Sequence, residues 1–216
     1  MLMPASAALA AVPLELTVAL ETYRGDPPRG WSFTQTTAAQ GKSTVERCDA
    51  LKPEFDRWSL LQKDGRAPTA DETKDYDEMR SRRSRGGTAP KLTDQFDLTT
   101  LEVASDNPER PTFRLRLKQG ESGDKTAAFL RLTLVLHKPT RTIESLELAS
   151  TGEFHPTIGV TILEMKTVMT YSLPAADRPS MPLLVTTRLR GDAFYVKSLD
   201  ADMTVTFSDF ERVGKK

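Results

Sequence analysis

The feature that most constrains the fold is the strand-like last third of the chain, which ends in the run MTVTFSDF (residues 203–210). Successive side chains of a strand point to opposite faces, so Met203, Val205 and Phe207 are expected on one face and hydroxyl-bearing residues on the other. Such a sheet has a dry face that needs a cover. Leaving it open would forfeit about 25 cal/mol for each Å² of apolar surface. The cover is the chain's own helices, a partner, or an apolar ligand.

The same alternation extends through most of the chain. In residues 112–118 Phe113, Leu115 and Leu117 alternate with basic residues, as in a half-buried strand. Turn-forming residues separate the segments, and Gly191-Asp192 is expected to form a tight hairpin turn. The expected strands are Trp31–Thr37, Ser43–Asp49, Phe55–Lys63, Thr99–Ala104, Thr112–Lys118, Phe129–His137, Thr142–Ala149, Val160–Tyr171, Leu183–Arg190, Ala193–Lys197 and Met203–Phe210.

Two segments are expected to be helical. The first runs from Pro13 to about Tyr23, and the second from Thr69 to Arg85. Thr69 followed by Glu72 is typical of a capping box, in which each residue satisfies an orphan amide of the first turn. The arginine cluster at the end of this second helix (Arg80, Arg82, Arg83 and Arg85) is interpreted as a solvated helix end, with an anion-binding surface as the alternative. Together the elements predict an α+β fold, a long curved and mostly antiparallel sheet with two or three helices on its inner side.

Composition and motifs argue against several classes of function. Basic and acidic residues balance at 30 each, which disfavours nucleic acid as a partner. The single cysteine, Cys48, excludes an internal disulfide and a thiolate metal cluster. His137 and His155 are expected at strand ends or turns, and no nucleophile elbow, zinc motif, P-loop or dinucleotide-binding pattern is present. We therefore expect no catalytic residues, no metal and no cofactor.

The first twelve residues are uncharged and rich in Ala and Leu, with a small-x-small pattern at Ala8-Leu-Ala10. We interpret residues 1–12 as the remnant of an export signal or a disordered lead, and residues 13–216 as one domain. The stretch is too short to span a bilayer, which takes about 20 apolar residues. These features predict a soluble periplasmic protein without a transmembrane segment, and we expect it to be a monomer.

Several short motifs resemble a known family. They are Trp31-Ser-Phe-Thr, Glu46-Arg-Cys-Asp, Trp58-Ser-Leu-Leu, the segment Gly152-Glu-Phe-His-Pro and the closing Thr206-Phe-Ser-Asp-Phe. Taken in this order, the chain resembles bacterial exported proteins of the outer-membrane lipoprotein carrier (LolA/LolB-like) type, including members of unknown function. The resemblance implies an unclosed β-barrel whose concave apolar face is capped by helices and accepts acyl chains. On that face we expect the ligand-binding residues Phe113, Leu115, Leu132, Leu134, Val205 and Phe207.

Three functions compete at this point. The first is a periplasmic binder or carrier of a lipid, an acyl chain or a lipidated protein. The second is a structural or protein-interaction module of the cell envelope with a filled core and no ligand. The third, an esterase-like or hydrolase-like enzyme, needs a clustered catalytic site that the sequence does not reveal.

Overall fold

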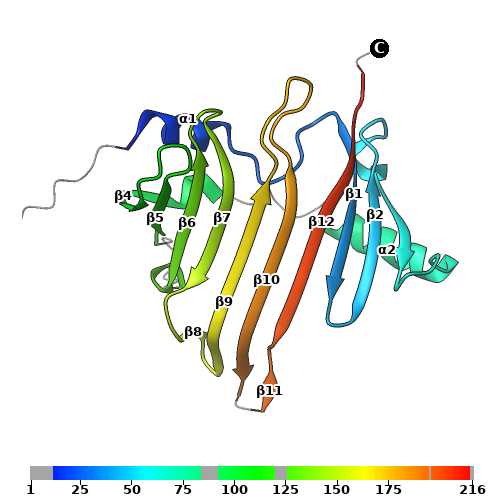
Figure 1. The fold of residues 1–216 in the computed structure, drawn as a ribbon. Helices are drawn as coiled ribbons and strands as arrows, with labels where there is room; N and C mark the ends of the chain where they lie inside the picture. Colours follow the sequence, from blue (N-terminus) through cyan, green and yellow to red (C-terminus); the bar gives the residue numbers. More distant parts are fainter. Residues whose placement is uncertain (1–11, 84–91, 120–125, 195, 215–216) are drawn as a thin grey trace, which may run out of the picture.

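The structure, a computed structural model, describes residues 12–83, 92–119, 126–194 and 196–214. These residues form a twelve-stranded sheet and two α-helices (Figure 1). The α-helices are α1 (Leu14–Thr22) and α2 (Ala70–Arg83), and the 3-10 helices are η1 (Glu54–Asp56), η2 (Leu92–Gln95) and η3 (Thr126–Phe129). The strands are β1 (Trp31–Ala39), β2 (Lys42–Cys48), β3 (Trp58–Lys63), β4 (Phe96–Ser105), β5 (Thr112–Leu117), β6 (Leu130–His137), β7 (Thr142–Ser150), β8 (Phe154–Thr157), β9 (Val160–Tyr171), β10 (Pro182–Ala193), β11 (Lys197–Ser198) and β12 (Ala201–Arg212).

The sheet is curved, antiparallel and not closed into a barrel. Its order is β3-β2-β1-β12-β10-β9-β7-β6-β5-β4, with β8 and β11 attached beside β9 and β10. The two edge strands, β3 and β4, lie at opposite ends of this order (Figure 1). The predicted fold class, an unclosed barrel with helices, is confirmed.

One face of the sheet can be followed across nearly its whole width by strand register. Phe113 of β5 is paired with Leu134 of β6, which is paired with Leu146 of β7. The row continues through Met169 of β9. It then passes to Val185, Val205, Thr37 and Thr44 of β10, β12, β1 and β2. Side chains in register share a face, so this row is continuous from the packed part of the sheet to the strands beneath α2.

Helix α1 covers the face at the β4–β7 end. Its buried residues Leu16 and Ala19 belong to the same apolar cluster as the strand leucines Leu132 and Leu134, all of which are essentially inaccessible. The alternation of β5 and β6 explains this packing, because their odd- or even-numbered apolar residues all point to one side. The principal dry core therefore lies between α1 and strands β4–β7.

Helix α2 starts as the sequence predicts. The Glu72 amide donates to Thr69 Oγ1 at 3.2 Å, and the Thr69 amide donates to Glu72 Oε2 at 2.9 Å. This reciprocal pair is the capping box expected from the spacing of the two residues. Glu72 also accepts hydrogen bonds from Arg66, which ties the loop before the helix to its first turn.

Two local predictions are wrong. Phe55 does not begin the third strand but lies in η1, and β3 starts at Trp58. Gly191 and Asp192 do not form a turn but extend β10 to Ala193, so the expected strand Ala193–Lys197 is replaced by a turn before the two-residue β11. Gly191 instead allows β9 and β10 to approach each other closely at a register shift. A Cβ at this position would lie 2.3 Å from the Thr161 carbonyl oxygen.

Candidate functional site

In the middle of the concave face, a group of partly accessible side chains lies outside the hydrophobic core. We call this set the open floor. Its members come from β9, β10 and β12 and keep part of their surface accessible, whereas Leu146, which is in register with Met169, is buried. They are Thr167, Met169, Val185, Thr187, Met203 and Val205.

The open floor combines apolar and adaptable side chains with few polar groups. Met169 and Met203 are flexible thioethers, which adjust to ligands of irregular shape. The hydroxyls of Thr167 and Thr187 lie 3.2 Å apart and satisfy each other across β9 and β10. An apolar ligand could therefore contact this surface without stripping water from an unpaired hydroxyl.

A cavity of about 510 Å³ lies between α2 and the sheet, at the end of the open floor. We call it the α2 cavity. Its volume falls within the roughly 300–1,000 Å³ range of small-molecule sites. Met203 and Val205 of the open floor line it from β12, Leu60 from β3, and Tyr76 and Met79 from α2. The cavity is thus an extension of the same concave face beneath the second helix.

A buried ion pair holds α2 over this cavity. An Nη2 hydrogen of Arg80 is donated to Glu46 Oε1 of β2 at 2.8 Å, and the Glu46 side chain is only 8% exposed. Gln35 Nε2 donates to the other carboxylate oxygen at 3.0 Å. The guanidinium also lies over the Trp58 ring, with Cζ 4.2 Å from the ring centroid, and donates through Nε to the Tyr76 hydroxyl at 3.1 Å. Both charges are therefore satisfied by several partners at once.

This cluster perturbs its titratable members. Burial raises the pKa of the Tyr76 phenol, and the neighbouring Glu46 carboxylate raises it further. Burial opposes the charge of Arg80, but Glu46 and Tyr76 together raise the pKa of the guanidinium above its ordinary value. Tyr76 therefore stays a neutral hydroxyl beside a charged arginine. The cluster forms a fixed polar wall of a cavity whose remaining lining combines apolar side chains with Lys63, Glu72 and Asp75.

The interpretation of Arg80 as part of a solvated helix end is wrong. The signal that sequence reasoning missed is Glu46, a carboxylate on the same face of β2 as Thr44 and Cys48, where the strand pattern calls for uncharged residues. A charge at such a position needs a counter-charge. Arg80, four residues after the buried Tyr76, supplies it from the same side of α2. The side chains of Arg82, Arg83 and Arg85 lie outside the described residues.

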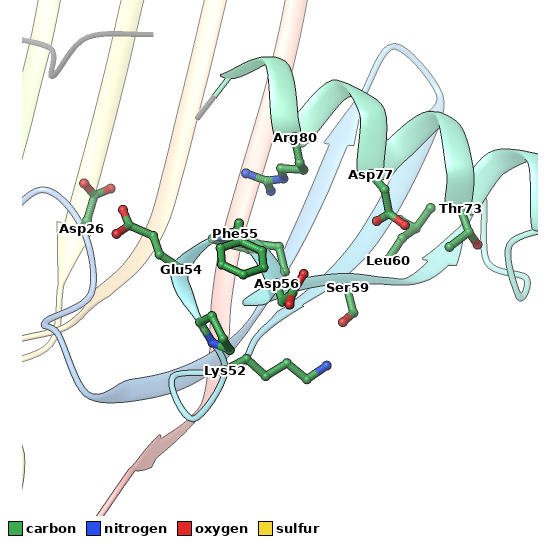
Figure 2. A pocket seen from close by; sticks show the side chains of 12 residues that line it. Asp26, Lys52, Glu54, Phe55, Asp56, Ser59, Leu60, Thr73, Asp77 and Arg80 are labelled. Carbon is green, nitrogen blue, oxygen red and sulfur yellow. The ribbon is translucent and has the colours of Figure 1, made fainter. Parts of the chain in front are cut away.

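Arg80 also borders a second cavity of about 1,150 Å³, which opens between α2 and the segment that contains η1 (Figure 2). In Figure 2 the carboxylates of Asp26, Glu54, Asp56 and Asp77 surround it, and Phe55 lies among them. Its lining is mostly polar and acidic. It therefore differs in chemistry from the α2 cavity, although the two share Arg80 and Leu60.

A third cavity, of about 380 Å³, lies against α1 at the other end of the sheet. Tyr23 and Tyr171 line it, with their hydroxyl oxygens 2.6 Å apart and their rings edge to face. Burial raises the pKa of both phenols, so the pair stays protonated and hydrogen-bonded. This pair joins α1 to the end of β9 next to the open floor.

The six residues predicted to bind a ligand divide between the two parts of the face. Val205 lines the α2 cavity, and Phe207 is half-buried against Phe33 and two residues away from Val205 on the same face. The expectation of a fully dry face on the last strand is thus too strong, since Met203 is exposed. The other four are buried in the core beneath α1: Phe113, Leu115, Leu132 and Leu134.

The residues considered for catalysis, His137, His155 and Cys48, have different structural surroundings. His137 is buried at the end of β6, and its Nδ1 lies 2.7 Å from Thr140 Oγ1. His155 is an exposed residue of β8, and its Nε2 lies 3.5 Å from Glu153 Oε1. Cys48 is buried in β2, and burial raises the pKa of its thiol. Within the described ranges no group of three or more His, Cys, Asp or Glu side chains is arranged to hold a metal. Across those same ranges no helix combines the length and apolarity needed to cross a bilayer.

The fold and this face define an open, curved antiparallel sheet with two helices on its concave side. No family model matches the chain, and no curated protein matches it. Among solved structures, the chain is similar to the crystal structure of a DUF1329 family protein from Desulfovibrio piger ATCC 29098, with 8% identity and a TM-score of 0.38 over 94% of this chain and 92% of that one.

Proposed function

We propose that this protein is a non-enzymatic binding or carrier protein for a lipid, an acyl chain or a lipidated protein, exported to the periplasm. One observation carries the proposal. A single sheet face is covered beneath α1, yet the same face continues in register through the methionine, valine and threonine side chains of the open floor to the α2 cavity.

Physical chemistry favours an apolar ligand at this place. The open floor offers methionine and valine side chains and mutually satisfied hydroxyls, and the α2 cavity supplies further apolar walls. Burial of that surface by a ligand releases its hydration, at about 25 cal/mol for each Å². The resemblance of short motifs to lipoprotein carriers supports the same class of ligand.

A second candidate function is the envelope interaction module with a filled core. The dry core beneath α1 favours it, because Leu16, Leu132 and Leu134 have no accessible surface there. The α2 cavity favours the carrier instead, because the module needs no internal space.

The carrier proposal is tested by filling the cavity. Val205→Trp places an indole on the cavity floor and should weaken binding of a fluorescent fatty acid by about tenfold or more, which corresponds to about 1.4 kcal/mol. The matched control is Thr206→Trp, since Thr206 lies next in the strand on the opposite, exposed face. Thermal unfolding of both variants separates lost binding from lost structure.

Native mass spectrometry supplies a second readout. The carrier predicts that wild-type protein purified from the periplasm retains lipid and that Val205→Trp retains less. A wild-type protein that is free of lipid and takes up no fluorescent fatty acid would overturn the carrier proposal. That result would leave the interaction module as the preferred function.

A further inference from the structure

Two hairpin turns at one end of the sheet expose apolar side chains that nothing in the binding proposal uses. Ile158, in the turn between β8 and β9, is 93% exposed. Phe194 and Val196, in the turn between β10 and β11, are 67% and 88% exposed. Figure 1 places both turns at the same end of the sheet, beyond the ends of its longest central strands. We call Ile158, Phe194 and Val196 the apolar tip.

The two turns form one unit. The Phe194 amide donates a hydrogen bond to the Gly159 carbonyl, across the pairing of β9 with β10. The Phe194 ring lies directly on Gly159, where a Cβ would be 2.4 Å from a ring carbon. Gly159 also has a positive φ of 77°. Both this backbone conformation and the contact with the Phe194 ring therefore require a glycine. Phe194 therefore fixes the end of one turn against the other turn.

Three backbone amides at the tip have partners within it. Besides the Phe194 amide, the Val196 amide donates to the Ala193 carbonyl at 3.2 Å, and the Leu199 amide donates to the Gly191 carbonyl at 2.9 Å. A segment that enters hydrocarbon must pair its own amides, because no water is available there. The three amides named here meet this requirement.

The charges near the tip suit a lipid surface. Lys197 is exposed and follows Val196 directly, where it can reach headgroup phosphates. Two carboxylates near the tip, Asp200 and Asp202, are engaged behind it. Asp200 accepts the Gly191 amide at 3.1 Å, and Asp202 accepts both Nη2 hydrogen bonds of Arg190 at 2.7 and 2.9 Å.

We propose that the apolar tip inserts into the boundary between headgroups and acyl chains of a lipid bilayer. The tip is convex, and a bilayer accepts a convex apolar wedge without a complementary pocket. A protein partner would need such a pocket. Apolar and aromatic side chains beside a lysine are the combination that interfacial membrane anchors use.

Insertion would also orient the concave face. Strands β9 and β10, which carry most of the open floor, run directly from the tip. Met169 lies eleven residues after Ile158, or about 36 Å of extended strand at roughly 3.3 Å per residue. The bilayer would then meet the end of the floor strands. This inference goes beyond the proposed function and stands on different residues, so the two can fail separately.

The test is flotation of the full chain with vesicles of phosphatidylcholine and phosphatidylglycerol. Wild-type protein should float with the vesicles, and Ile158→Ser/Val196→Ser should lower the partition coefficient by about tenfold or more, because it removes most of the apolar surface of the tip. The matched control is Leu51→Ser/Phe55→Ser, which changes two residues that are 76% and 78% exposed in the connection between β2 and β3. That control should float like the wild type.

A second readout locates the contact. A dye that reports polarity, attached at Ile158→Cys in a Cys48→Ser background, should shift to the blue when vesicles are added, and the same dye at Leu51→Cys should not. Fatty-acid uptake by the Ile158→Ser/Val196→Ser variant should stay at the wild-type level, which separates this inference from the carrier proposal. Failure of the wild type to float, or equal losses in the tip and control variants, would overturn the inference.

Discussion

The two ends of the sheet use one continuous face in different ways. Under α1 the face is a dry core, in which Leu132, Leu134 and Leu146 have no accessible surface. Under α2 the face holds a cavity, and the helix is attached by a buried ion pair and by Tyr76. Apolar packing fills space from all sides, whereas a polar clamp fixes a helix at a few points. The contrast shows how one sheet can be closed at one end and leave room at the other.

The sharpest test of this comparison shortens one side chain in the packed part of the register row and one in the open floor of the same row. Leu134→Ala should lower the free energy of unfolding by about 2–5 kcal/mol, because it leaves a cavity in a filled core. Val185→Ala in the open floor should cost about 1 kcal/mol, since the removed methyl groups are half-exposed. Urea denaturation measures both. Equal losses would show that the two ends are packed alike.

The second prediction concerns the clamp on α2. Arg80→Ala should cost about 2–4 kcal/mol, because it leaves the Glu46 carboxylate buried without its counter-charge. Hydrogen exchange should rise in β1–β3 and stay unchanged in β5–β7. The control is Arg66→Ala, whose more exposed ion pair with Glu72 should contribute much less to stability. A uniform rise in exchange would mean that α2 also supports the core beneath α1.

A smaller effect is expected from the start of α2. Thr69→Ala removes one acceptor of the capping box and should cost about 1 kcal/mol. Thr69→Ser keeps the hydroxyl and should restore most of the loss. Circular dichroism during thermal unfolding measures both variants. No difference between them would show that the cap contributes nothing here.

The smallest expected effect is a pH dependence at the same cap. Hydrogen bonds from Arg66, from the Thr69 amide and from Lys63 hold the pKa of Glu72 well below its ordinary value. A carboxyl whose pKa is lower in the folded state stabilises the protein above its unfolded-state pKa of about 4.3, and this contribution fades as the pH falls below that value. Glu72→Gln should therefore be destabilising at neutral pH and progressively less so in acid. An effect that is constant over this range would show that charge is not involved.

The sequence predicts the packed half of this molecule better than the open half. In β5 and β6 every second residue is a large apolar one, so alternation identifies the buried face directly. In β9, β10 and β12 the same face carries threonine and methionine among the valines, and alternation alone could not show how far it is covered. Phe207 was expected to be as dry as Leu134 for this reason, and it is only half-buried.

The cavity beneath α2 depends on contacts that local patterns do not encode. Glu46 and Arg80 are 34 residues apart in the chain, and only the pairing of β2 with β1 and β3 brings the carboxylate beneath the helix. The capping box, by contrast, spans three residues and could be identified from its spacing alone. The role of the six predicted ligand-binding residues stays a prediction, as does the single-domain boundary at residues 13–216. The export segment assigned to residues 1–12 falls, except for Val12, outside the described residues.

An unclosed sheet has a further consequence, because its terminal strands offer free backbone groups to other chains. Exposed edges of this kind can seed polymerisation. Strand β4 has a discontinuous register with β5, which shifts between Asp97 and Glu102 and again between Val103 and Ser105. Irregular pairing bends the edge strand, so it is a poor partner for a strand of another chain. On the opposite margin β3 is short and ends at Lys63, whose ammonium pairs with Glu72. Both margins are therefore built to discourage edge-to-edge assembly while the sheet stays open.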